Sequence, residues 1–216
     1  KSQHSIHHLE ALFFGQAGLL ESEAQNAYIS ELKSTYEFLK HKFSLSREGV
    51  IPVHFFRLRP PNFPTIRLAQ LAGVYSRRSN LFSSIIEAQS LEQLYTIFEG
   101  STSSFWNTHY TFEKTSKSSS KTLTKAFMNL LIINTIVPIK FAFHKFNRYS
   151  NPDNVLAIIR NIPMEHNSIV DKFHSMYAFG KTALDSQALI QLKHMYCSKN
   201  KCLQCAIGSA ILNRNS

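Results

Sequence analysis

The sequence predicts an all-α fold, an irregular domain of about eight to ten helices. Apolar residues recur at helical spacing in one segment after another, for example from Ile66 through Leu71 to Tyr75. Signals for helix starts precede several of these segments, whereas no two strand-like segments are joined by a hairpin dipeptide. The sequence shows no internal repeat period, so it favours an irregular assembly of helices.

The first two helices are predicted in the N-terminal part of the chain. Residues 3–20 carry apolar residues at helical spacing, together with Gly15 and Gly18. Glycine lowers helix propensity but leaves room, so these positions should let another helix approach closely. Ser22 and Gln25 have the spacing of a capping box, which predicts that the second helix starts there.

A proline-rich loop at residues 44–64 separates these helices from the next group. Residues 114–121 form a basic run with few apolar side chains, and they are the candidate for an internal boundary. The aromatic residues just before this run need a core in which to be buried. We therefore predict one helical domain over residues 1–216, with a possible boundary inside it at residues 114–121. Short helices are expected at residues 66–75, 81–88 and 91–98.

A long helix is predicted from about Lys121, with a kink at Pro138. Its apolar stretch, residues 126–143, is interrupted by polar residues and by Lys140. A membrane span needs about 20 largely apolar residues, so the stretch is interpreted as a buried helix and no membrane partner is expected.

Further helices are predicted towards the C-terminus. Asp153 follows a cap and a proline that mark the start of one helix, and another is expected from about Asn167 to Tyr177. Thr182 and Asp185 have the spacing of a capping box, which predicts a helix that ends near the cysteines.

The formal net charge of +10 is unevenly distributed. Residues 1–113 hold 10 Lys and Arg against 10 Asp and Glu, whereas residues 114–216 hold 14 against 4. A basic half can attract phosphate backbones or acidic partners, and an acidic partner domain would explain the excess equally well.

The chain's three cysteines lie within nine residues of its C-terminal part: Cys197, Cys202 and Cys205, with His194 ahead of them. His194 and Cys197 are three residues apart, as are Cys202 and Cys205, so each pair would share a helix face. Asn200 can cap the second of these helices. Two helix ends meeting at the turn would bring the four side chains together as a Cys₃His set, which suits a structural, tetrahedral zinc ion.

Two other interpretations of this Cys/His corner stay open. Free cysteines are often buried as small apolar side chains, which needs no metal. Cys202 and Cys205 could instead form a redox pair with basic neighbours. An iron–sulfur cluster would need a further ligand, because the chain has no fourth cysteine.

Lys140, Lys145 and Arg148 form a basic stripe interleaved with aromatic residues. Such a stripe can meet phosphates while the aromatic rings stack on bases, which makes nucleic acid a possible partner. The alternative is an amphipathic helix whose lysines reach out to solvent over a phenylalanine core.

The sequence contains little that points to catalysis. It has no nucleophile-elbow motif, and the acids of the basic half have no spacing that implies acid–base work. Clustered cysteines without an N-glycosylation acceptor favour a reducing interior, so a cytoplasmic location is expected.

Three segments resemble an uncharacterised bacterial family, mainly from Bacteroidetes, that is known as a domain of unknown function. They are residues 9–20 (LEALFFGQAGLL), 56–71 (FRLRPPNFPTIRLAQL) and 185–208, which include DSQALIQL and CLQCAIG. The resemblance is to the family's C-terminal half. It implies that a further, N-terminal domain precedes this one, richer in strands and loosely similar to a nuclease-type fold.

The leading expectation is a non-enzymatic helical domain that supports this N-terminal domain as its partner, with the Cys/His corner as a structural staple. A nucleic-acid-binding module attached to a nuclease-like domain is the alternative. A redox or iron–sulfur protein is the third.

Overall fold

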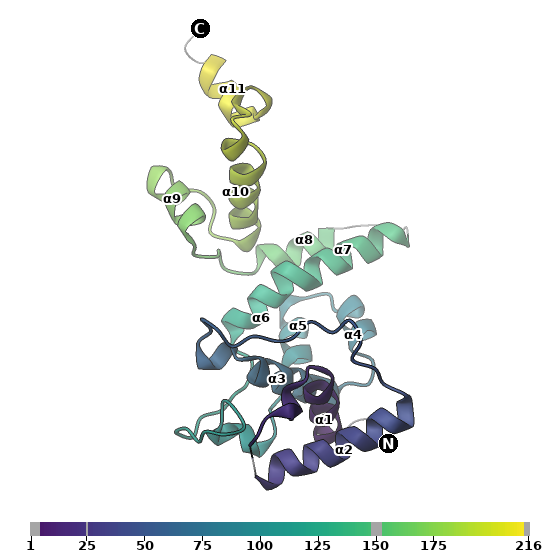
Figure 1. The fold of residues 1–216 in the computed structure, drawn as a ribbon. Coiled ribbons are helices and arrows are strands. Elements are labelled where there is room, and N and C mark those ends of the chain that lie inside the picture. Colours follow the sequence, from purple (N-terminus) through teal and green to yellow (C-terminus); the bar gives the residue numbers. More distant parts are fainter. Residues whose placement is uncertain (1–4, 25, 148–152, 214–216) are drawn as a thin grey trace. The chain divides into compact units, whose positions relative to one another are not determined.

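The computed structural model describes residues 5–24, 26–147 and 153–213 (Figure 1). Its described residues form helices and loops, with two isolated β-bridges and no strand. The all-α prediction is confirmed. Because α6 and α7 are joined by a π-helical turn, Ile132–Ile136, the described chain has ten separate helices. The α-helical segments are α1 (Ile6–Gln16), α2 (Ala27–Phe43), α3 (Pro64–Arg77), α4 (Leu81–Glu87), α5 (Leu91–Phe98), α6 (Lys125–Leu131), α7 (Val137–Phe146), α8 (Asp153–Arg160), α9 (Ser168–Met176), α10 (Ala183–Met195) and α11 (Ala206–Asn213).

The chain divides into two compact units. Unit 1 comprises residues 1–85 and 95–128, and unit 2 comprises residues 86–94 and 129–216. The basic run at residues 114–121 lies inside unit 1. The chain passes between the units within α4, within α5 and within α6.

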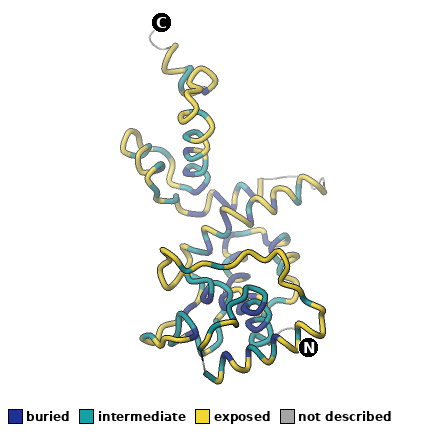
Figure 2. The backbone as a smooth tube through the Cα atoms, in the orientation of Figure 1, coloured by how far each residue is buried: buried dark blue, intermediate teal, exposed yellow. Residues whose placement is uncertain are grey.

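Helix α1 is the central element of unit 1, because it packs against both α2 and α3. Its Phe14 is fully buried and meets the rings of Trp106 and Phe112, each at a centroid distance of 5.4 Å. Along α2, buried positions such as Leu32 alternate with exposed ones, which is the pattern of a surface helix with one inward face (Figure 2).

Gly15 lets α2 approach α1 closely, as its position in the sequence predicts. A Cβ atom at Gly15 would lie 2.1 Å from a ring atom of Tyr36. Gly73 likewise lets the segment after α5 approach α3 closely, because a Cβ atom at Gly73 would lie 2.4 Å from the carbonyl oxygen of Ser101.

A buried polar network joins α1, α2 and the aromatic segment around Trp106. The carboxylate of Glu10 accepts hydrogen bonds from the Tyr28 hydroxyl (2.7 Å) and from Trp106 Nε1 (3.1 Å). The Tyr28 hydroxyl also lies 3.0 Å from Ser103 Oγ. Desolvation raises the pKa of Glu10, and desolvation together with the nearby Glu10 raises the pKa of Tyr28.

Side chains of α3 hold the loop before α6 against unit 1. Thr65 Oγ1 donates to the carbonyl oxygen of Tyr110 at 2.6 Å, and Gln70 Nε2 donates to that of Lys121 at 2.8 Å. Lys121 itself is buried, with its ammonium 3.1 Å from the Ser119 carbonyl oxygen. The aromatic segment and the basic run are therefore parts of one folded unit.

The kink predicted at Pro138 takes the form of a π-helical turn just before it. Proline has no N–H to donate and its ring crowds the preceding turn, so a wider turn accommodates it. The 22-residue helical stretch Lys125–Phe146 is long and apolar enough to cross a membrane, a property that core helices share. Met128, Ile132, Ile133 and Ile136 are buried along it, whereas Leu130, Ile139, Phe141 and Phe146 are exposed, and 28% of its apolar window is buried. The prediction of a buried helix holds for one face of the stretch, and the absence of a membrane partner stays a prediction.

Of the two predicted capping boxes, one is confirmed and one is wrong. Thr182 and Asp185 form a capping box at the start of α10. The predicted capping box of Ser22 with Gln25 is wrong, because α2 begins later, at Ala27, where Asn26 accepts a hydrogen bond from the Ile29 N–H. Gln25 lies outside the described residues, as do the cap and proline predicted before Asp153.

Candidate functional site

The Cys/His corner is irregular in structure. Helix α10 ends at Met195, and two 3₁₀ turns, Cys197–Lys199 and Cys202–Gln204, follow before α11. The prediction that Asn200 caps a helix is wrong. Asn200 adopts a left-handed conformation, with φ of 53°, where the first turn ends.

The three cysteines line one apolar cavity of about 210 Å³, together with Phe173, Tyr196 and other residues of unit 2. Cys197 and Cys202 are exposed and Cys205 is buried, and all three are free thiols. His194 is exposed and does not line this cavity.

Among the described residues, no three His, Cys, Asp or Glu side chains lie close enough together to hold a metal ion. The structure thus brings the three cysteines to one cavity but does not assemble the Cys₃His set. Zinc binding stays a prediction.

The residues of the predicted basic stripe occupy different environments. Lys140 is 1% exposed, and its ammonium donates to the carbonyl oxygens of Ile86 (2.6 Å) and Ala88 (2.8 Å) at the end of α4. Desolvation lowers the pKa of Lys140. Lys140 therefore satisfies carbonyl groups at a helix end and is not part of an exposed basic surface. Lys145 is exposed, and Arg148 lies outside the described residues.

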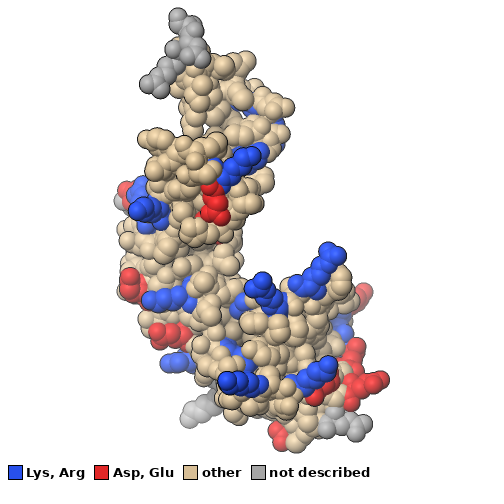
Figure 3. All heavy atoms as spheres, turned by 90° about the vertical axis from the view of Figure 1, so that its left-hand side faces the viewer, with Lys and Arg blue, Asp and Glu red and all other residues tan. Residues whose placement is uncertain are grey.

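On the face drawn in Figure 3, the Lys and Arg side chains are scattered and are separated by uncharged surface. A nucleic-acid backbone is tracked best by a continuous basic groove. Nucleic-acid binding stays a prediction, with Lys145 as the described residue that remains available for it.

An apolar groove lies between α1 and the C-terminal end of α2. It has a volume of about 570 Å³, and we call it the α1–α2 groove; it is lined by His8, Leu9, Leu12, Phe38, Leu39, Lys42, Phe43 and Leu45. Phe38 and Phe43 remain 59% and 50% exposed. The ammonium of Lys42 lies 5.6 Å and 5.4 Å from the centroids of these two rings.

Sequence reasoning missed this groove, although one signal for it was present. The helical stripe of Leu32 and Leu39 accounts for the inward face of α2, and Phe38 falls beside that stripe. A large aromatic residue on the polar side of a surface helix is a candidate contact residue.

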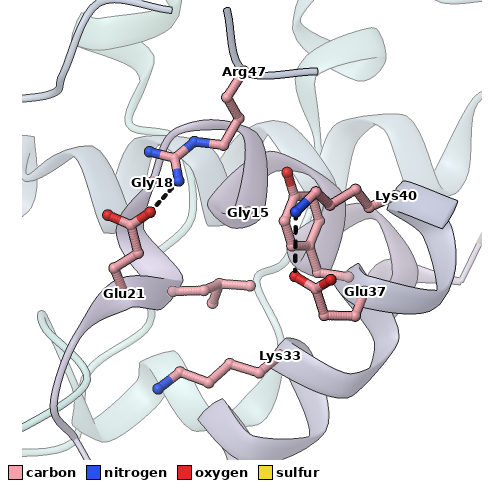
Figure 4. Close-up of a pocket in the computed structure, with 9 residues that line it drawn as sticks. Gly15, Gly18, Glu21, Lys33, Glu37, Lys40 and Arg47 are labelled. Atoms are coloured by element: carbon pink, nitrogen blue, oxygen red, sulfur yellow. Dashed lines mark hydrogen bonds and ion pairs between the residues drawn. The ribbon is translucent and has the colours of Figure 1, made fainter. Parts of the chain in front are cut away.

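A second, charged pocket lies at the C-terminal end of α1 (Figure 4). It has a volume of about 290 Å³, and we call it the Gly15 pocket; it is lined by Gly15, Gly18, Leu20, Glu21, Lys33, Tyr36, Glu37, Lys40 and Arg47. Arg47 pairs with Glu21, and Lys40 pairs with Glu37 at 3.8 Å. The sequence predicts a role in helix packing for the two glycines, whereas the charged residues belong to no recognisable motif.

A family model described as "Protein of unknown function (DUF2851)" matches residues 1–168. No curated protein and no solved structure matches the chain. The matched region contains the α1–α2 groove and the Gly15 pocket, and it ends before the cysteines. The comparisons give no named relative from which a specific function would follow.

Proposed function

The chain belongs to the DUF2851 family of proteins of unknown function, and we propose that it acts as a non-enzymatic helical interaction domain. The α1–α2 groove is the observation that carries this proposal. It presents two half-exposed phenylalanines beside a hollow that is lined by four leucines. Exposed apolar surface of this kind on a soluble domain is typical of an interaction site.

The gain available from covering the groove is substantial. Full burial of a phenylalanine side chain contributes about 1.5–3 kcal/mol, and Phe38 and Phe43 each still expose about half of theirs. Covering both rings would therefore contribute on the order of 2 kcal/mol, before the leucines are counted. That is enough for these rings to act as anchor residues in an interface.

The charge at the groove indicates the partner's chemistry. Lys42 lies over both rings, and the last turn of α2 also contains Lys40 and His41. An apolar partner segment would cover the rings, and an acidic residue at its edge would pair with Lys42. The proposed partner is thus an amphipathic helix with an acidic margin, the form in which helices commonly occupy such grooves.

The family resemblance adds a source for this helix: the N-terminal domain of the same polypeptide. On this proposal the chain supports that domain by holding one of its helices. The acidic margin of the helix would offset part of the chain's positive charge.

Selection of peptides from a random display library on the immobilised protein tests the proposal. Selected peptides should share apolar residues at helical spacing with a flanking Asp or Glu. Phe38→Ala should weaken their binding about tenfold, the equivalent of about 1.4 kcal/mol. Phe82→Ala is the matched control, because Phe82 is 55% exposed on α4 and lies outside the groove. Peptides that bind the Phe38→Ala protein as tightly as the unaltered one would contradict the proposal.

A structural zinc ion at the Cys/His corner is a second proposal, which the shared cavity of the three cysteines supports. His194 would have to turn towards the cavity to complete the set. Metal analysis of anaerobically purified protein tests it: one equivalent of zinc per chain is expected. A metal-free protein with a Cys202–Cys205 disulfide would favour the redox alternative instead.

Nucleic-acid binding is kept as the alternative function because of the net charge of +10. If phosphates dominate, binding to DNA or RNA should weaken steeply as salt is added. No binding at low salt would exclude this alternative for the chain. The cytoplasmic location and the bacterial origin also remain proposals.

A further inference from the structure

We propose that the Gly15 pocket binds a small organic carboxylate with an apolar or aromatic body. This inference goes beyond the interaction function and does not depend on it, because the pocket and the α1–α2 groove share no lining residue. Three features of the pocket support the proposal: its charged side chains, the Tyr36 hydroxyl and two glycines.

Two ion pairs line the pocket, Arg47 with Glu21 and Lys40 with Glu37. In Figure 4 the guanidinium of Arg47 lies beside Gly18 and the ammonium of Lys40 lies on the other side of Gly15, each next to its carboxylate. A ligand carboxylate in the pocket would share these cations with the two glutamates, and arginine can bind a carboxylate with two parallel hydrogen bonds.

The two carboxylates of the protein orient the cations at little cost to ligand binding. The side chains of Glu21 and Glu37 are 72% and 69% exposed, and surface ion pairs of this kind contribute about 0–1 kcal/mol. A ligand can therefore share Arg47 and Lys40 with them.

Tyr36 supplies a hydrogen-bond donor at the same place. It is 6% exposed, lines the pocket, and its hydroxyl oxygen accepts a hydrogen bond of 3.0 Å from Gln16 Nε2. Because this hydrogen bond uses the hydroxyl oxygen as acceptor, the Tyr36 hydroxyl can still donate its proton to a ligand oxygen.

The two glycines let Tyr36 and Arg47 lie directly against the backbone of α1 and of the turn that follows it. A Cβ atom at Gly15 would overlap the Tyr36 ring, and one at Gly18 would lie 2.2 Å from Arg47 Nη2. Gly18 also has φ of 74°, a left-handed conformation that favours glycine. Any larger residue at these positions would displace a wall of the pocket.

The net charge of the lining side chains and the volume of the pocket restrict the class of ligand that it can bind. Three cationic and two anionic side chains line the pocket, which leaves one net positive charge and favours a monoanion over a phosphate dianion. Lys33 contributes its stem to the wall, and its ammonium donates to the carbonyl oxygen of Ser22 at 3.0 Å. Leu20 and the Tyr36 ring offer an apolar surface for the rest of the ligand. The volume of about 290 Å³ is at the small end of ligand pockets.

Calorimetric titration with benzoate, acetate, phenyl phosphate and benzyl alcohol tests the proposal. Benzoate should bind with a dissociation constant on the order of 1 mM, and the other three probes at least about five times more weakly. Benzyl alcohol lacks the charge, acetate lacks the ring and phenyl phosphate carries a second negative charge. Tighter binding of phenyl phosphate than of benzoate would overturn the assignment to a carboxylate.

Substitutions of the lining residues test whether benzoate binds in the Gly15 pocket. Arg47→Gln and Tyr36→Phe should weaken benzoate binding about tenfold and threefold, and Arg47→Lys should restore part of the loss because it keeps the charge without the bidentate geometry. Lys117→Gln is the control, since Lys117 is an exposed lysine of unit 1 that lines neither this pocket nor the α1–α2 groove. Unfolding midpoints equal to that of the unaltered protein establish that the variants are folded. Absence of benzoate binding at 10 mM, or equal weakening by Lys117→Gln and Arg47→Gln, would show that the cations serve only the helix end and would overturn the proposal.

Discussion

The buried carboxylate of Glu10 accepts a hydrogen bond of 2.7 Å from the hydroxyl of Tyr28. Glu10 is fully buried, and within the described part of the chain it forms no ion pair; Trp106 Nε1 is a further hydrogen-bond donor to its carboxylate. Desolvation is the largest effect on this group and raises its pKa above the ordinary value of 4.5. The network therefore orders the core of unit 1 while making its stability depend on pH.

The first prediction is that Glu10→Gln removes this pH dependence. A carboxyl group whose pKa is raised by folding contributes stability below its unfolded pKa and loses it as the pH rises through the folded pKa. The free energy of unfolding of the unaltered protein should thus fall, relative to the variant, as the pH rises above 4.5, by at most about 1.4 kcal/mol per unit. Urea denaturation of both proteins at several pH values measures the difference.

A glutamine at this position can still satisfy the network. Its oxygen accepts from Trp106 Nε1, its amide donates to the Tyr28 hydroxyl, and Tyr28 then donates to Ser103 Oγ. The variant should consequently fold at pH 7 and differ from the unaltered protein by less than about 1 kcal/mol below pH 4. A difference that stays constant across the pH range would contradict the assignment of a raised pKa to Glu10.

The second prediction concerns Lys140, whose ammonium binds the carbonyl oxygens of Ile86 and Ala88. Lys140→Met keeps the apolar stem and leaves these acceptors without their donor. Each unsatisfied buried acceptor costs about 1–3 kcal/mol, so the loss of both bonds should destabilise the variant by about 2–6 kcal/mol. Thermal and urea unfolding measure this loss.

Lys145→Met is the control for Lys140, because Lys145 lies on the same helix and is exposed. Exposed substitutions usually change stability by less than about 0.5 kcal/mol. The same pair separates the two roles that the sequence suggested for these lysines. If Lys145→Met destabilised the protein as much as Lys140→Met, the capping of α4 by Lys140 would not be the cause.

The third prediction is that Gly73→Ala destabilises unit 1. The added Cβ would lie 2.4 Å from the carbonyl oxygen of Ser101, a backbone atom that cannot move without shifting its segment. Overpacking of this kind costs about 1–3 kcal/mol. Gly49→Ala is the comparison, since nothing lies within 4 Å of its Cβ and only the strain at φ of 76° remains. We expect Gly73→Ala to lower the unfolding midpoint at least as much as Gly49→Ala does.

Local signals explain most of what the sequence predicted correctly. The periodicity of apolar residues predicted the helices, and the capping box of Thr182 with Asp185 predicted the start of α10. Both features depend on residues that are close together in the sequence. The resemblance to a family of unknown function was confirmed for residues 1–168. The Ser22 cap failed because Asn26, four residues later, competes for the same helix start, and Ser22 instead donates to Glu113.

The candidate sites depend on contacts that the sequence does not reveal. Lys140 and Lys145 are both followed by a phenylalanine in the sequence, and only the position of the α4 C-terminus distinguishes a buried capping lysine from an exposed one. Arg47 likewise becomes a pocket residue through the left-handed turn at Gly18, which lies 29 positions earlier in the chain. The burial of Lys140 and the place of Arg47 in the pocket are both determined by contacts between segments that lie far apart in the sequence.

The last prediction distinguishes the three interpretations of the Cys/His corner. In metal-free protein, Cys197 and Cys202 are exposed and Cys205 is buried, so a thiol reagent should modify two cysteines quickly and the third more slowly. Zinc bound by all three thiolates would protect them together, and a chelator would release this protection. A redox pair would leave only Cys197 reactive until a reductant is added. Cys205→Ser should abolish the slow phase in metal-free protein, and a slow phase that persisted in this variant would contradict the burial of Cys205 as its cause.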